Sequence, residues 1–152
     1  MKRIAIQTEG FDLGAVESSL TAGRSELGAM VSFVGRVRDF SDRPGVRALT
    51  LEHYPGMTEA VLDALADEAL TRWRLGGVAI IHRVGRLSPG DEIVLVAVAC
   101  AHRKAAFEAC EFIIDRLKTQ APFWKKEHSD EGDRWVGERM SDRWASERWE
   151  GP

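Results

Sequence analysis

The sequence predicts an α+β fold, a mostly antiparallel sheet with two main helices. Two stretches, Met57–Trp73 and Ala105–Lys118, carry apolar residues at helical spacing. Short alternating or β-branched segments lie around them and are separated by turn residues, the pattern of strands in a sheet. Ile93–Ala101 is almost continuously apolar, as in a strand buried on both faces. Because there are no repeats or low-complexity segments, we expect a single domain over residues 1–152.

In the N-terminal half we expect strands at Ile4–Gln7, Ala29–Val37 and Ala48–Tyr54. A short helix is expected at Asp12–Leu20 and a loop at Asp39–Gly45. Ala29–Val37 is β-branched and aromatic, and alternation places Arg36 and Arg38 on one face at its end. Pro44-Gly45 marks the following segment as an exposed loop.

The C-terminal half is expected to add strands at Val78–Val84, Ile93–Ala101, Phe123–His128 and Arg134–Val136, and a last helix. Ser88-Pro89-Gly90-Asp91 suits a type II turn, and Ser141 is expected to cap the last helix. Four of the five tryptophans lie from Trp124 onward. We therefore expect the tail to be docked or to form an interface.

Composition restricts the possible classes of protein. Apolar residues make up 44% and charged residues 30%, and the net charge of −3 argues against a general nucleic-acid binder. The start of the chain lacks a signal peptide, and no apolar run reaches membrane-spanning length, so a cytoplasmic protein is expected. Cys100 and Cys110 lie in apolar surroundings and are expected to be buried and reduced.

The segment Lys118–Glu127 contains two lysines beside Pro122-Phe123-Trp124. An ammonium next to desolvating aromatic rings can act as a nucleophile or an acid–base group. A helix stop followed by a surface strand with snorkelling lysines is the structural alternative. In a strand, Lys125 would share a face with Phe123 and Glu127, and Lys126 would point the other way, so Lys125 is the better candidate.

Three potential cations, His102-Arg103-Lys104, join a predicted buried strand to a predicted helix. Acidic or Ser/Asp residues are favoured at a helix N-terminus, so this segment contains a local conflict that a bound anion would resolve. A solvated basic turn is the alternative. Arg36 and Arg38 are either a phosphate-binding pair or two solvated side chains.

The chain has no P-loop, no GxGxxG after a strand, no GxSxG and no HExxH. Its four histidines show no metal-ligand spacing, and His53 and His82 are expected to be strand residues rather than ligands. Composition and sequence pattern alone therefore predict a soluble α+β protein with an anion-binding site that contains lysines.

Six stretches of the chain resemble those of a known family and occur in the same order as in that family. They are Gly35–Arg38, Leu49–Met57, Ile81–Gly85, Pro89–Glu92, Ala101–Arg103 and Leu117–Glu127. Together they resemble the large, catalytic subunit of molybdopterin synthases. The resemblance implies a two-layer fold of the hammerhead type with an added small β subdomain. It also implies a homodimer at the centre of a heterotetramer, in which each outer subunit is a small ubiquitin-like sulfur carrier that ends in Gly-Gly.

The implied substrate is cyclic pyranopterin monophosphate, which receives sulfur from the thiocarboxylate of the carrier to form molybdopterin. The implied substrate-binding residues are Arg38, His102, Arg103, Lys118, Lys125 and Arg139, the last from a neighbouring protomer. Lys118 would sit at the carrier's terminal glycine and Lys125 would be a general acid–base or a second anchor. No cofactor, metal or catalytic cysteine is implied.

Two other classes of function remain open at this stage. The loop Asp39–Val46 departs from the asparagine- and glycine-containing loop of the family, which leaves open a non-catalytic module that binds an anion or a ubiquitin-like tail. A nucleic-acid binder would use the arginines and tryptophans, but its basic strand ends lack interleaved aromatic residues.

Overall fold

The computed structural model describes residues 1–38, 45–136 and 140–150. Its strands are β1 (Lys2–Gln7), β2 (Ala29–Arg36), β3 (Val46–His53), β4 (Gly77–Arg83), β5 (Gly85–Leu87), β6 (Glu92–Cys100), β7 (Phe123–Ser129) and β8 (Gly132–Val136). Its helices are α1 (Leu13–Thr21), α2 (Met57–Trp73), α3 (Arg103–Gln120) and α4 (Met140–Glu147). The predicted α+β class, with two long helices and antiparallel pairing in most of the sheet structure, is confirmed.

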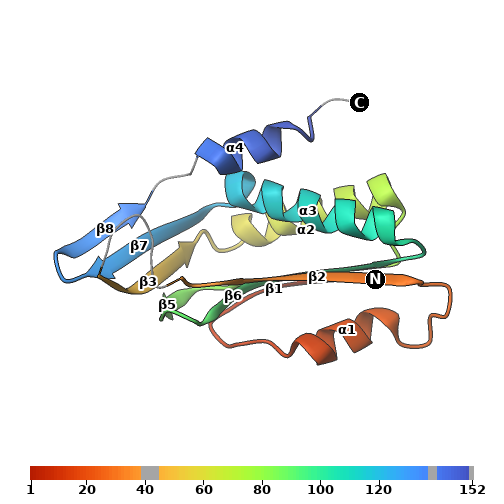
Figure 1. Cartoon of the computed structure of the whole chain (residues 1–152), viewed down its shortest axis with the longest axis horizontal. Coiled ribbons are helices and arrows are strands. Elements are labelled where there is room, and N and C mark those ends of the chain that lie inside the picture. Colours follow the sequence, from red (N-terminus) through yellow and green to blue (C-terminus); the bar gives the residue numbers. More distant parts are fainter. Residues whose placement is uncertain (39–44, 137–139, 151–152) are drawn as a thin grey trace.

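The main sheet has the strand order β1-β4-β6-β2, in which only β1 and β4 run parallel. Helices α2 and α3 cover one face and α1 covers the other (Figure 1). Val78 and Ile80 of β4 accordingly pack in the core under α2 and α3, whereas Ala79 and Ile81 pack under α1. Burial on both faces explains why the central strands are apolar without alternation.

A second, fully antiparallel sheet has the order β5-β3-β7-β8 and extends beyond the main sheet (Figure 1). The β3–β7 register aligns His53 with Phe123, Leu51 with Lys125 and Leu49 with Glu127. Directly paired residues in such a ladder point to one face, so these six side chains share it. This sheet is the small β subdomain that the family resemblance implies.

Two details of the prediction are wrong. Helix α4 begins at Met140, so Ser141 lies in its first turn and is not its cap. Strand β5 was not predicted, because a three-residue strand gives no periodic signal. The Ser88–Asp91 turn is as predicted: the Asp91 amide donates to the Ser88 carbonyl at 3.0 Å, and Gly90 has φ +91°.

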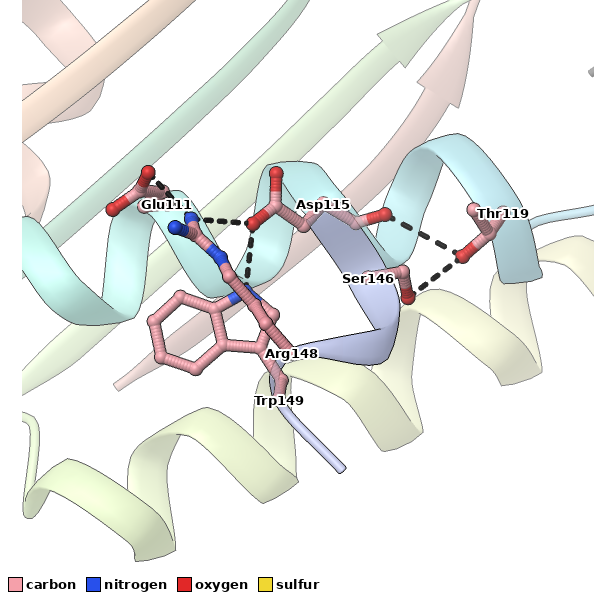
Figure 2. A network of polar contacts seen from close by, with 6 residues as sticks. All are labelled: Glu111, Asp115, Thr119, Ser146, Arg148 and Trp149. Carbon is pink, nitrogen blue, oxygen red and sulfur yellow. Dashed lines mark hydrogen bonds and ion pairs between the residues drawn. The ribbon is translucent and has the colours of Figure 1, made fainter. Parts of the chain in front are cut away.

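The tail is docked through its last described residues (Figure 2). Trp149 Nε1 donates to Asp115 Oδ2 at 2.6 Å, and Arg148 bonds the same carboxylate at 2.9 Å. The Trp149 ring meets Trp73 and Phe112 with centroids 5.8 and 5.6 Å apart. Ser146 and Thr119 add a hydroxyl pair at 2.9 Å. The prediction of a docked tail is therefore confirmed for Trp149, whereas Trp144 is 64% exposed.

Candidate functional site

The two candidate lysines lie on either side of the junction between α3 and β7. Lys118 is exposed in the last turn of α3, where a cation is favoured by the helix dipole. The helix stops at Ala121, which is extended, and Pro122 leads directly into β7. Thr58, fully buried in α2, fixes the junction: its hydroxyl oxygen lies 3.3 Å from the Pro122 carbonyl oxygen.

The charges of both lysines act on the imidazole of His82, near the end of β4. The pKa of His82 is lowered to about 4, mainly by burial and also by the charges of Lys118, Lys125 and His53, while a hydrogen bond with the Arg83 carbonyl opposes the shift. The Nδ1–O distance of that bond is 2.8 Å, so Nδ1 carries the proton of a neutral ring. Elements α3, β7 and β3 therefore supply three cationic or titratable groups that lie near enough to the end of β4 for their charges to act on His82.

Alternation along β7 separates Lys125 from Lys126, as predicted. Lys125 shares its face with Phe123, which stacks on His82 at 3.9 Å, and with Glu127, which is 2% exposed. Lys126 lies on the other face, where its ammonium is 5.4 Å from the centroid of the Trp135 ring. The inner face of the second sheet thus carries Lys125 toward the main sheet.

The two arginines after β2 have different surroundings. The Arg36 guanidinium donates to the Gly90 carbonyl at 3.2 and 3.0 Å, which fixes it to the Ser88–Asp91 turn. Val37 is buried between the exposed Arg36 and Arg38. Val37 packs with Leu49 and Leu51, the cross-strand partners of Glu127 and Lys125. Arg38 therefore emerges beside the sheet that carries Lys125.

His102 and Arg103 lie at the opposite end of α3 from Lys118. The helix has 18 residues, and at about 1.5 Å per residue Arg103 and Lys118 are roughly 22 Å apart along its axis. His102 occupies the N-cap position without a side-chain cap, and the first turn contains no acidic residue, so the predicted conflict is present. Within a single chain, His102 and Arg103 consequently lie far from Lys118 and Lys125.

Arg139 and most of the loop Asp39–Val46, residues 39–44, lie outside the described residues. Within the described part, no three His, Cys, Asp or Glu side chains are grouped so as to hold a metal ion. No helix in that part is both long enough and apolar enough to cross a membrane. Cys100 and Cys110 are free and buried, and burial raises the pKa of Cys110 to about 12.

Sequence reasoning missed His82 and Phe123 as parts of the site. His82 was expected only as a strand residue and Phe123 only as a desolvating ring beside the lysines, and their stacking joins segments far apart in the chain. A histidine at the end of an otherwise apolar strand was the available signal. The fold and these residues define an α+β protein in which two lysines flank the junction between α3 and β7, and their charges act on a buried, neutral imidazole. Sites of this class suit anionic substrates and proton transfer at an amine.

Known proteins identify the family. The pattern described as "MoaE protein" matches residues 6–120, and the chain belongs to that family. The molybdopterin synthase catalytic subunit of Ralstonia nicotianae is 54% identical over 149 residues, covering 98% of this chain and 85% of that relative. The molybdopterin biosynthesis MoaE protein from Burkholderia ambifaria has a structure with TM-score 0.85 and 51% identity over 100% of both chains.

A more distant structure shares the fold. It is the complex of subunits 1 and 2 of the molybdopterin-converting factor from Helicobacter pylori, with TM-score 0.71 and 22% identity over 91% of each chain.

Proposed function

We propose that this chain is the catalytic subunit of a molybdopterin synthase. It transfers sulfur from the thiocarboxylated C-terminus of a small carrier subunit to cyclic pyranopterin monophosphate, and so forms the dithiolene of molybdopterin. Family membership and the names of relatives about half identical to this chain support the activity. The structural observation that carries the proposal is the placement of Lys118 and Lys125 on either side of the junction between α3 and β7, where Phe123 of β7 stacks on His82.

The roles of the lysines follow from their places. Lys118, exposed at the end of α3, is accessible to an incoming chain terminus, and its ammonium would stabilise the negative charge of a thiocarboxylate. Lys125, half-buried beside Phe123, would donate or accept the proton as carbon–oxygen bonds of the substrate give way to carbon–sulfur bonds. Arg38 would bind the phosphate, since a guanidinium matches it with paired donors.

The sulfur would arrive on the partner. Cys110 is a poor nucleophile because its raised pKa keeps the thiol protonated. The partner in this proposal is a small ubiquitin-like carrier that ends in Gly-Gly, in line with the two-subunit complex from Helicobacter pylori that shares the fold.

A second copy of this chain would complete the substrate site. Because α3 separates Arg103 from Lys118 by roughly 22 Å, His102, Arg103 and Arg139 would reach the lysines of a neighbouring protomer. Phe107, one helical turn after Arg103, is 63% exposed, and Phe33 on the edge strand β2 is 39% exposed. This apolar surface suits a homodimer at the centre of a heterotetramer. We place the protein in the cytoplasm and treat residues 1–152 as one domain.

Reconstitution with a thiocarboxylated carrier and the pterin substrate tests the activity. Lys118→Ala and Lys125→Ala should each lower turnover at least about a hundredfold, the scale of a lost acid–base group. Lys126→Ala is the matched control, since it removes a neighbouring amine from the other face of the same strand. If both active-face variants keep wild-type turnover, or if the carrier binds without any product, the mechanism is wrong and the binding module is favoured.

Mixed dimers test the shared site. Lys118→Ala and Arg103→Ala chains, each inactive alone, should recover about a quarter of wild-type turnover when refolded together, because half of the dimers would contain one intact site. Lys118→Ala mixed with Lys125→Ala should recover nothing beyond the single variants, since those two residues serve the same site. Recovery in the second mixture but not in the first would refute the assignment.

A further inference from the structure

His82 lies where the two sheets meet. Its neighbours two and four residues back, Ile80 and Val78, pack under α2 and α3, so the imidazole points to the same side as those helices. The ring is 9% exposed and stacks on Phe123 with centroids 3.9 Å apart and planes inclined by 18°. This contact joins the end of β4 to the first residue of β7.

The groups whose charge lowers the pKa of the ring come from three elements: Lys118 from α3, Lys125 from β7 and His53 from β3. His53 in turn pairs with Glu59, whose carboxylate is 3.5 Å from His53 Nε2. The strand partners of His82, Ile6 and Val94, are apolar. A protonated, positively charged imidazole at position 82 would therefore repel both lysines, whereas a neutral ring lets two ammonium groups approach one ligand.

Phe123 links the position of the His82 ring to the position of β7, the strand that carries Lys125. Lys125 follows it by two residues on the same face, and a strand places such side chains about 7 Å apart. The Nδ1 bond to the Arg83 carbonyl fixes the plane of the imidazole, and the stack fixes Phe123 on that plane.

We propose that His82 is a positioning residue for the sulfur-transfer reaction: stacked on Phe123, it sets the start of β7 so that Lys125 and Lys118 face the same substrate. This inference rests on the proposed function, because the reaction supplies the kinetic test. It assigns His82 no proton transfer and no contact with a metal.

Kinetics of the complex with carrier give the first test. His82→Leu keeps an apolar side chain but removes the flat ring, and should lower kcat ten- to a hundredfold while the KM for the pterin changes less than about threefold, as for a misplaced catalytic group. Phe123→Leu should cause the same loss from the other side of the contact, and the double variant should lose no more than either single one. His82→Phe, which keeps a stacking ring, should recover most of the loss.

His128→Leu is the matched control. This imidazole also lies in a strand, bonded to Thr50 Oγ1 at 2.7 Å and to Asp133 at 2.9 Å, but Asp133 and Thr50 flank it on the face away from Lys125. Its loss should lower the unfolding temperature without changing kcat. The proposal is overturned if His82→Leu lowers only the unfolding temperature, or if His82→Phe is as impaired as His82→Leu.

A measurement that does not depend on turnover tests the role of His82 separately from the proposed sulfur-transfer activity. Nitrogen NMR of His82 should show the Nδ1–H tautomer, and Lys118→Ala or Lys125→Ala should raise the pKa of His82, because each removes a cation that disfavours protonation. If neither substitution changes that pKa, the lysines do not face the ring and the proposal fails. A wild-type complex that lacks turnover would instead refute the proposed function, even where the NMR titration shows the coupling.

Discussion

Replacing Trp149 with alanine should undo the docking of the C-terminal tail. The indole contacts Trp73 and Phe112 and donates a hydrogen bond to the Asp115 carboxylate, whose second partner is Arg148. The two aromatic contacts contribute about 0.5–1.5 kcal/mol each beyond burial. A hydrogen bond to a charged group contributes about 1.5–3 kcal/mol.

The ring is only half-buried, so we expect a loss of about 3 kcal/mol, the lower end for removal of a buried aromatic side chain. For a chain of this length, that loss lowers the unfolding temperature by roughly 6–12 °C. Trp149→Phe keeps the ring contacts and loses the bond to Asp115, and should cost about 1.5 kcal/mol, the lower end of the range for such a bond.

Thermal and urea unfolding, followed by circular dichroism, measure these differences. Trp144→Ala is the control, because Trp144 belongs to α4 and is 64% exposed. Its effect should remain within about 0.5 kcal/mol. A Trp149→Ala protein as stable as the wild type, or a Trp144→Ala protein equally destabilised, would show that the tail is not held by these contacts.

Three further predictions concern buried polar groups. Native Cys110 should resist iodoacetamide at pH 8 and react only in denaturant, as mass spectrometry can show, because burial raises its pKa to about 12. Because the pKa of His82 is lowered to about 4, the unfolded chain binds more protons than the folded chain below pH 6.5. The free energy of unfolding, measured with urea, should therefore fall by about 2 kcal/mol between pH 7 and pH 5. His82→Phe should remove this pH-dependent loss. Thr58→Val should cost about 1–3 kcal/mol in the same assay, since the buried hydroxyl bonds the Tyr54 and Pro122 backbone; an unchanged midpoint would contradict this.

The sequence predicted the local elements well because their signals are local. Periodicity placed α2 at Met57–Trp73, as observed, and Pro89-Gly90 marked the turn before β6. Strand alternation correctly separated Lys125 from Lys126. The three-residue β5 and the start of α4 carry too few residues for a pattern to mark them.

The arrangement of the site was only partly predictable. The distance between Arg103 and Lys118 follows from the helix length alone, so the predicted helix could have separated these two residues, which the expected site had grouped together. The stack of His82 on Phe123 joins two strands of different sheets, and no local pattern reports such a contact. The roles of Arg38, His102, Arg103, Lys118, Lys125 and Arg139 stay predictions that the kinetic variants test.

At the junction of Ala121 and Pro122, the number of residues between α3 and β7 is more tightly constrained than the identity of those residues. The register of β7 is fixed on both sides by pairing with β3 and β8, and by Glu127, buried on its inner face. Deleting one residue before Phe123 would either stretch the junction or slide the strand by one position, which would turn Lys126 inward and Lys125 outward. Sequence drift in this segment should therefore proceed by substitution at outward positions, while insertions and deletions are eliminated.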